Sequence, residues 1–180
     1  MRKEYSKEVK SEFEAQLWGA YPQFRNEKWQ PSMARNSSLY RFEVNEHLNF
    51  FIKLIPHRTF HDFTVEVGWS ENEIVPPGRA LAKPYEPQDI NGAVVRLCIF
   101  YLPNSDPWWE VEPKPSTKQI LRQWKERDLA ESDPNDYLPR VPAVIADAVA
   151  KIKMYAIPYF IRIATERGVG VVFDVSNSKS

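Results

Sequence analysis

Two histidines four positions apart are the first candidates for chemistry. His57 and His61 stand in the segment HRTFHD, directly after Pro56. On a helix such a pair shares one face and binds zinc. Here it lies between two strand patterns, where a hairpin connection points the side chains in unrelated directions, and a third ligand is missing. We therefore interpret the segment as a polar turn and predict no metal site.

Paired carboxylates are the second candidates. Glu71 and Glu73 are two residues apart, as are Glu110 and Glu112. In strands each pair would share a face, and acid–base catalysis would need a pocket that shifts the pKa values of the two carboxylates. The sequence contains neither a G-x-S-x-G elbow nor a G-x-x-x-x-G-K-[ST] phosphate loop. We predict no catalytic and no cofactor-binding residues, and we interpret these carboxylates as solvated.

Tryptophans and acids in the middle of the chain favour a binding surface. Residues 62–112 contain nine acidic and three basic residues in a chain of zero net charge. Trp108 and Trp109 are adjacent, so in an extended segment they face opposite ways. An acidic surface with a tryptophan anchor suits a basic protein partner. The alternatives are a solvated face and two tryptophans that pin a loop to the core. The predicted partner-binding residues are Trp69, Glu71, Glu73, Asp106, Trp108, Trp109 and Glu110.

Strand patterns surround these residues. Two runs between Leu48 and Ser70, LNFFIKLI and FTVEVGWS, alternate in hydrophobicity as half-buried antiparallel strands do. A run at 39–44 extends them to a three-stranded meander. The run at 93–102 is almost wholly apolar and predicts a central strand covered on both faces. A final strand is predicted over 169–175.

Helices are predicted towards both ends of the chain. The first spans 3–18, and a short one is predicted over 117–129, followed by a loop at 133–136. The last begins near Pro142. Residues at helical spacing form one apolar stripe on each of the two terminal helices. These stripes are Tyr5, Val9, Phe13, Leu17 and Ala20, and then Ile145, Ala148, Ile152, Tyr155, Tyr159 and Ile163.

Two residues shape the end of the last helix. Pro158 lies within the helical pattern and lacks a backbone donor, so we predict a kink or a break near 155–157. Gly168 is the predicted end of the helix.

The order helix, strands, helices predicts an α+β fold. We expect an antiparallel sheet, a meander of about four to five strands, packed against the N-terminal and C-terminal helices. Residues 1–176 would form one domain, and 177–180 a disordered tail. The single Cys98 fits a reducing compartment. The charged N-terminus lacks the apolar stretch of a signal peptide, and no run approaches the length of a membrane span. We therefore expect a cytoplasmic protein with no membrane partner and, at zero net charge, no nucleic-acid partner.

With these residues placed, the chain resembles a family of uncharacterised bacterial domains. The resemblance rests on the amphipathic N-terminal helix, on the segment FTVEVGWS at the end of the meander, and on the motif YAIPYF at 155–160. It does not extend to the proline-containing residues 76–115. Some members are similar to the immunity proteins that accompany secreted toxins. The resemblance implies a small cytosolic binding protein and transfers no catalytic residue.

The sequence thus leads to two hypotheses of different classes. The first is a non-enzymatic cytosolic binding protein, an immunity-type inhibitor of a partner protein. The second is a small-molecule-binding protein or an enzyme with a pocket between the sheet and the C-terminal helix. Residues expected to line that pocket are Arg96, Tyr155, Tyr159 and Arg162.

Overall fold

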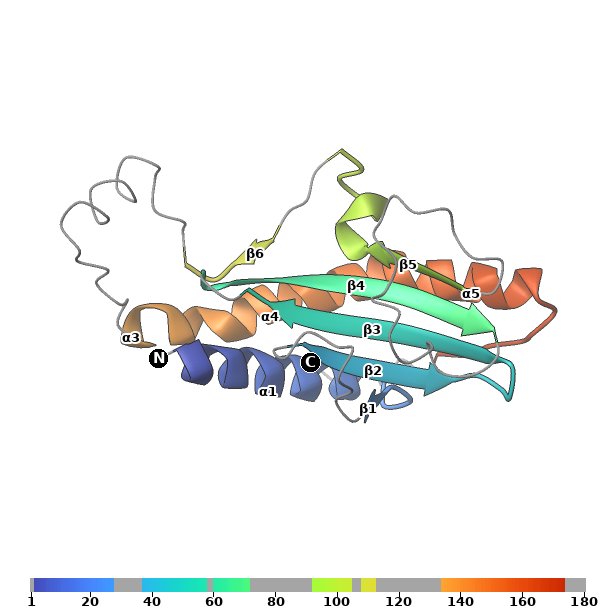
Figure 1. Cartoon of the computed structure of the whole chain (residues 1–180), viewed down its shortest axis with the longest axis horizontal. Helices are drawn as coiled ribbons and strands as arrows, with labels where there is room; N and C mark the ends of the chain where they lie inside the picture. Colours follow the sequence, from blue (N-terminus) through green and yellow to red (C-terminus); the bar gives the residue numbers. More distant parts are fainter. Residues whose placement is uncertain are drawn as a thin grey trace.

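The computed structural model describes residues 2–27, 37–57, 60–71, 92–104, 108–112 and 134–173. They form an α+β fold with a six-stranded antiparallel sheet (Figure 1). The strands are β1 (Arg25–Glu27), β2 (Ser38–Glu43), β3 (Leu48–Pro56), β4 (Asp62–Glu71), β5 (Gly92–Arg96) and β6 (Trp109–Glu110). The helical elements are α1 (Arg2–Ala20), η1 (Leu97–Phe100), α3 (Pro134–Tyr137), η2 (Leu138–Arg140), α4 (Val141–Lys151), η3 (Ile152–Ala156) and α5 (Ile157–Glu166).

The sheet is centred on the predicted hairpin. Strands β3 and β4 pair over the whole of β3, from Leu48 opposite Glu71 to Pro56 opposite Phe63. The strand order is β1-β2-β3-β4-β5, and β6 pairs with the beginning of β4. The meander of β2, β3 and β4 is therefore confirmed. Strands β1 and β6 are short additions at positions that the sequence pattern leaves in loops.

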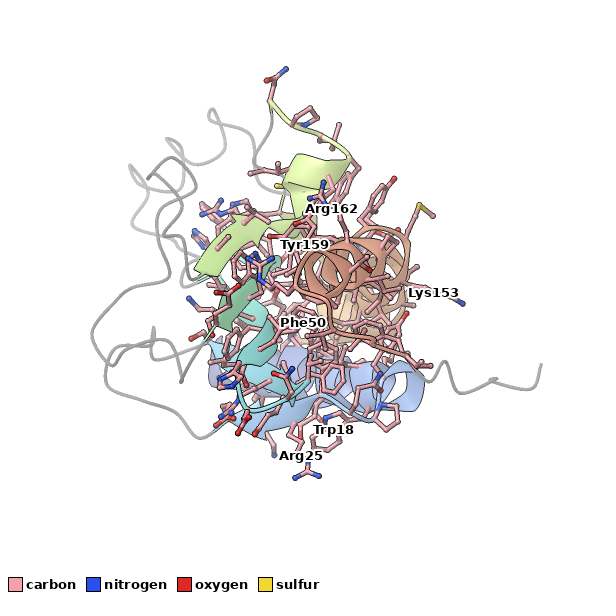
Figure 2. The ribbon with its side chains drawn as sticks, turned by 90° about the vertical axis from the view of Figure 1, so that its right-hand side faces the viewer. Trp18, Arg25, Phe50, Lys153, Tyr159 and Arg162 are labelled. Carbon is pink, nitrogen blue, oxygen red and sulfur yellow. The ribbon has the colours of Figure 1, made fainter. Side chains whose placement is uncertain are left out.

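The helices α1, α4 and α5 lie on one face of the sheet (Figure 2). The predicted stripe of α1 is buried apart from the partly buried Ala20, and alternate residues of β3, such as Phe50 and Ile52, are buried in the same core. Burial of such side chains is the main force that holds a helix against a sheet. The helix–sheet arrangement predicted from the sequence is confirmed.

The predicted interruption of the last helix is confirmed and has a defined form. Between α4 and α5 the chain makes the π-helical segment η3, in which the N–H of Ile157 bonds to the carbonyl of Ile152, five residues back. Pro158 follows directly. Since proline cannot donate to the carbonyl four residues before it, the wider turn accommodates it without a break in the helix. The predicted end at Gly168 is also confirmed, since this glycine has a positive φ of 68°.

Four predictions at the margins are wrong: the length and the central place of the strand at 93–102, the loop at 133–136, and the final strand at 169–175. Strand β5 ends at Arg96 and lies at the end of the strand order. The chain then turns into η1, which buries Leu97 and Cys98. Within the apolar run at 93–102 the buried residues are Ala93, Leu97 and Cys98, and Leu102 is exposed. The predicted loop at 133–136 contains most of α3, which begins at Pro134. Residues 169–173 form no strand. The predicted helix at 117–129, the prolines at 76–87 and the tail at 177–180 lie outside the described residues.

The π turn also corrects the predicted apolar stripe. After Ile152 the fully buried positions are Ala156, Phe160 and Ala164, whereas Tyr155 and Tyr159 are only partly buried. The extra residue in the wide turn rotates every later side chain by about 100° around the helix axis. The two tyrosines consequently leave the centre of the core and lie at its flank.

Candidate functional site

Trp69, Glu71, Tyr159, Arg162 and Arg167 form one cluster, which we call the arginine–aromatic cluster. It lies where the end of β4 meets α5. The guanidinium of Arg167 lies 3.7 Å from the centre of the Trp69 ring and makes an ion pair with Glu71. This stacking leaves Trp69 only 7 % exposed. A planar guanidinium over an indole gains both cation–π attraction and contact area.

The end of α5 fixes Arg167 in this place. The N–H of Gly168 bonds to the carbonyl of Thr165, and the N–H of Val169 to that of Ala164. With the positive φ of Gly168, these bonds form a Schellman motif, which satisfies the last carbonyls of a helix. The arginine immediately before the glycine is thereby held over β4.

Tyr159 joins the two arginines to the core. The indole N–H of Trp69 donates to its hydroxyl, and its ring packs against Phe100 at 5.1 Å between ring centres. Arg162 lies over the other part of the ring, 5.6 Å from its centre, and Figure 2 shows the two side chains next to each other. Burial raises the pKa of Tyr159, although the Trp69 hydrogen bond and the two arginines act to lower it. The hydroxyl therefore stays neutral at physiological pH.

The two arginines of the cluster differ in how closely they are paired with acids. Arg167 is engaged by Glu71, whereas the acid that Arg162 faces among the described residues is Glu166, at 3.8 Å, beyond hydrogen-bond distance. Arg162 is 65 % exposed. The cluster can thus present a guanidinium, held over an aromatic ring, to a molecule outside.

The structure brings together residues that the sequence assigns to different hypotheses. Trp69 and Glu71 were expected on a partner surface, and Tyr159 and Arg162 in a pocket. Sequence analysis missed Arg167, which connects them. Its position just before the helix-ending Gly168 was the only local signal for it.

The remaining residues of that expected pocket do not join the cluster. Tyr155 packs against Tyr101, with 5.3 Å between ring centres. Arg96 lies 5.7 Å from the centre of the Trp108 ring and 3.9 Å from Glu66.

Trp109 is a structural residue. It is 8 % exposed, and its ring stacks on Phe63 at 5.5 Å between ring centres. Its indole N–H donates to Asp147 of α4 at 2.9 Å, and Lys151 pairs with the same carboxylate. The side chain thus pins β6 to the helical layer, which is the alternative considered for it from the sequence.

Trp108 and Glu110 lie far from the arginine–aromatic cluster. Trp108 is half-buried and packs against His57 at 5.0 Å between ring centres, and Glu110 is exposed. Both lie near the beginning of β4, since Trp109 pairs with Phe63, six residues before Trp69. At about 3.3 Å per residue this places the two tryptophan sites roughly 20 Å apart. Glu73 and Asp106 lie outside the described residues.

The acids of β4 are compensated by neighbouring cations. Glu66 lies 3.3 Å from Lys53 and 3.9 Å from Arg96, and Glu71 pairs with Arg167. These two carboxylates therefore add little to the negative surface that the local composition predicts.

The two histidines separate, as expected of a turn. The N–H of Phe60 donates to Nδ1 of His57 at 3.1 Å, whereas Nδ1 of His61 lies 2.6 Å from Glu112. Within the described ranges, no three His, Cys, Asp or Glu side chains are placed to hold a metal ion.

His61 belongs to a second polar group, which sequence analysis missed. Its ring stacks on Tyr137 at 4.0 Å and meets the edge of Tyr5 at 5.0 Å between ring centres. Both tyrosines and Asp62 are fully or almost fully buried. Burial, and then the nearby Asp62 carboxylate and Tyr137, raise the pKa of Tyr5 far above its usual value. Tyr5 and Tyr137 meet only through the fold, so no local signal could have found this His61–Glu112 dyad and its tyrosines.

Comparison with protein-family models, with curated proteins and with solved structures found no match for this chain. Among the residues that the structure describes, no helix is long and apolar enough to cross a membrane. The fold and the site therefore define an α+β protein with an antiparallel sheet backed by helices. Its function must be argued from the site itself.

Proposed function

We propose that this chain is a non-enzymatic binding protein that engages a partner protein through the arginine–aromatic cluster. The observation that carries the proposal is the meeting of Trp69, Tyr159, Arg162 and Arg167 in one contact network at the end of β4. Tryptophan, tyrosine and arginine are the residue types that dominate binding energy at protein interfaces.

The aromatic side chains of the cluster are packed against one another before any partner arrives. Trp69 is covered by Arg167, and Tyr159 is held by the Trp69 hydrogen bond and by Phe100. This packing supports Arg162, the exposed side chain that a partner would contact. The accessible part of the surface is Arg162 and Glu166 on α5, with Glu71 at the margin.

We propose that binding inhibits the partner, as it does in immunity proteins. It rests on the family resemblance of the two ends and the meander. The expected basic character of the partner rested partly on Glu71, which Arg167 compensates. The proposal therefore fixes the surface and leaves the overall charge of the partner open.

Site-specific photocrosslinking tests the surface. A benzophenone amino acid would replace Glu166 in one version of the protein and Lys153 in another, so that Arg162 stays in place, and both would be exposed to an extract of the source cell. Lys153 is the control because it is an exposed charged residue that projects from the helical layer away from Tyr159 (Figure 2). We expect one protein to be crosslinked at position 166 and not at 153. Equal labelling at both positions, or none at 166, would refute the proposed surface.

A second candidate function, ligand binding or acid–base chemistry, is favoured by the His61–Glu112 dyad. A carboxylate that orients an imidazole is a recurring part of such sites. The buried tyrosines on both sides of His61 would exclude water from it. Screening the protein against a metabolite library by thermal shift tests this function. Stabilisation by a compound that His61→Asn abolishes would support it, and an unchanged response in that variant would dismiss it.

A further inference from the structure

We infer that Arg162 is the contact for a carboxylate on the partner protein, so that the partner presents an acidic side chain to the arginine–aromatic cluster. This inference rests on the proposed function and names the chemistry of its central contact.

The first observation is the state of the Arg162 guanidinium. Its contacts within the described residues are the Tyr159 ring at 5.6 Å and Glu166 at 3.8 Å. Neither takes a hydrogen bond from it, although a guanidinium carries five N–H donors in a fixed fork. At 5.6 Å from the Tyr159 ring centre the guanidinium is within cation–π range, and its donors stay open to the solvent. An arginine in this state is suited to a bidentate bond with a carboxylate.

The second observation is the division of charge between the two arginines. Glu71 makes an ion pair with Arg167, which also stacks on Trp69. Glu166 lies 3.8 Å from Arg162 and 3.9 Å from Arg167, so it is shared and bonds closely to neither. One guanidinium of the cluster is therefore closely paired and the other is not.

The charge balance also selects the kind of anion. Together with the neighbouring Glu166, the cluster holds two arginines and two glutamates, so the net charge of this site is zero. A phosphate group carries close to two negative charges at neutral pH and would be repelled by both glutamates. A carboxylate carries one charge and is repelled less, and the fork is open to it because Glu166 lies 3.8 Å away. The surface therefore favours an acidic protein segment over a phosphorylated segment or a nucleic acid.

The test uses defined probes and nuclear magnetic resonance. The full chain would be titrated at constant ionic strength with an acetylated hexaglutamate peptide, with a hexalysine peptide and with inorganic phosphate. The Nε–H signal of Arg162 and the indole N–H of Trp69 would be followed. We expect saturable shifts of both signals with hexaglutamate, and none with hexalysine. Arg162→Lys keeps the charge but loses the fork, so we expect affinity to fall by about tenfold, the loss of one charge-assisted hydrogen bond.

Three results would overturn the inference. One is a larger response to phosphate than to hexaglutamate, and the second is the absence of any saturable shift. The third is hexaglutamate binding that Arg162→Lys leaves unchanged. Each of these leaves the crosslink at position 166 as a separate measurement. The docking surface can therefore survive even if its chemistry has been assigned incorrectly.

Discussion

Gly68 allows β5 to approach β4 closely, and replacing it with alanine should destabilise the protein. A Cβ at this position would lie 2.6 Å from the carbonyl oxygen of Ala93 and 2.7 Å from a methyl carbon of Val94. Both contacts are well inside van der Waals distance, and the first is with backbone. The clash therefore requires strand β5 to move, because backbone cannot rotate away as a side chain can.

The size of the effect follows from this geometry. Forcing one carbon into a closely packed region costs typically about 1–3 kcal/mol. For a chain of this length each kcal/mol lowers the melting temperature by about 2–4 °C. We therefore expect Gly68→Ala to melt about 2–12 °C below the wild type, with a matching loss in guanidinium chloride unfolding.

Two other glycines make the comparison specific. At Gly19, in the last turn of α1, an added Cβ meets nothing within 4 Å, so alanine should stabilise the protein by up to about 1 kcal/mol. Gly168 is equally open, but its φ is +68°, so alanine there should cost about 1–2 kcal/mol through backbone strain alone. If Gly68→Ala unfolds at or above the wild-type temperature while Gly168→Ala behaves as expected, the close packing of β5 on β4 is wrong.

Three further predictions concern single contacts. Burial alone would raise the pKa of Asp147, but hydrogen bonds from Lys151 and Trp109 outweigh it, so the folded-state pKa lies below the ordinary 3.8. The stability it provides is present above pH 3.8 and is lost as the pH falls through the lower folded-state value. Urea unfolding at several pH values across this range should show a smaller loss of unfolding free energy at low pH in Asp147→Asn than in the wild type. An equal loss in the two proteins would contradict this prediction. Phe173 packs against five aromatic rings, among them Phe42 at 5.6 Å between ring centres, so Phe173→Ala should lose up to about 3–5 kcal/mol in guanidinium chloride unfolding. A loss below about 0.5 kcal/mol, the range of surface substitutions, would place this ring outside the core. Arg167→Lys keeps the charge but loses the stacking on Trp69, so its free energy of unfolding should fall by about 0.5–2 kcal/mol. The exposed Arg162→Lys is its control and should change stability by less than about 0.5 kcal/mol. Equal effects would show that the stacking on Trp69 adds nothing.

Local periodicity accounts for what could be predicted of the fold. The spacing of Tyr5, Val9, Phe13 and Leu17 determines the buried face of α1, and alternation along β3 and β4 determines their pairing. The run at 93–102 shows where this reasoning fails. Apolar residues are buried equally well in a strand or in a helical turn, so hydrophobicity alone could not distinguish β5 from η1.

The candidate site could be predicted only in fragments. Trp69 and Glu71 stand out by type and Tyr159 and Arg162 by their place beside Pro158, but about 90 residues separate the two pairs. Arg167 joins them because the Schellman motif at Gly168 points it back to β4. A turn of this kind is visible in the sequence as a glycine, but the strand that it faces is a property of the tertiary fold.

The π-helical segment explains why a surface exists at this place at all. In a regular α-helix without the π turn, the stripe Ile145, Ala148 and Ile152 would continue through Tyr155 and Tyr159. Both rings would then be buried in the core. The wide turn before Pro158 gives that role to Ala156 and Phe160. Tyr159 is thereby moved to the flank, where it accepts the Trp69 hydrogen bond and supports Arg162. The wide turn before Pro158 is therefore what places the Tyr159 ring beside Arg162 at the proposed surface, and π segments occur frequently at functional sites.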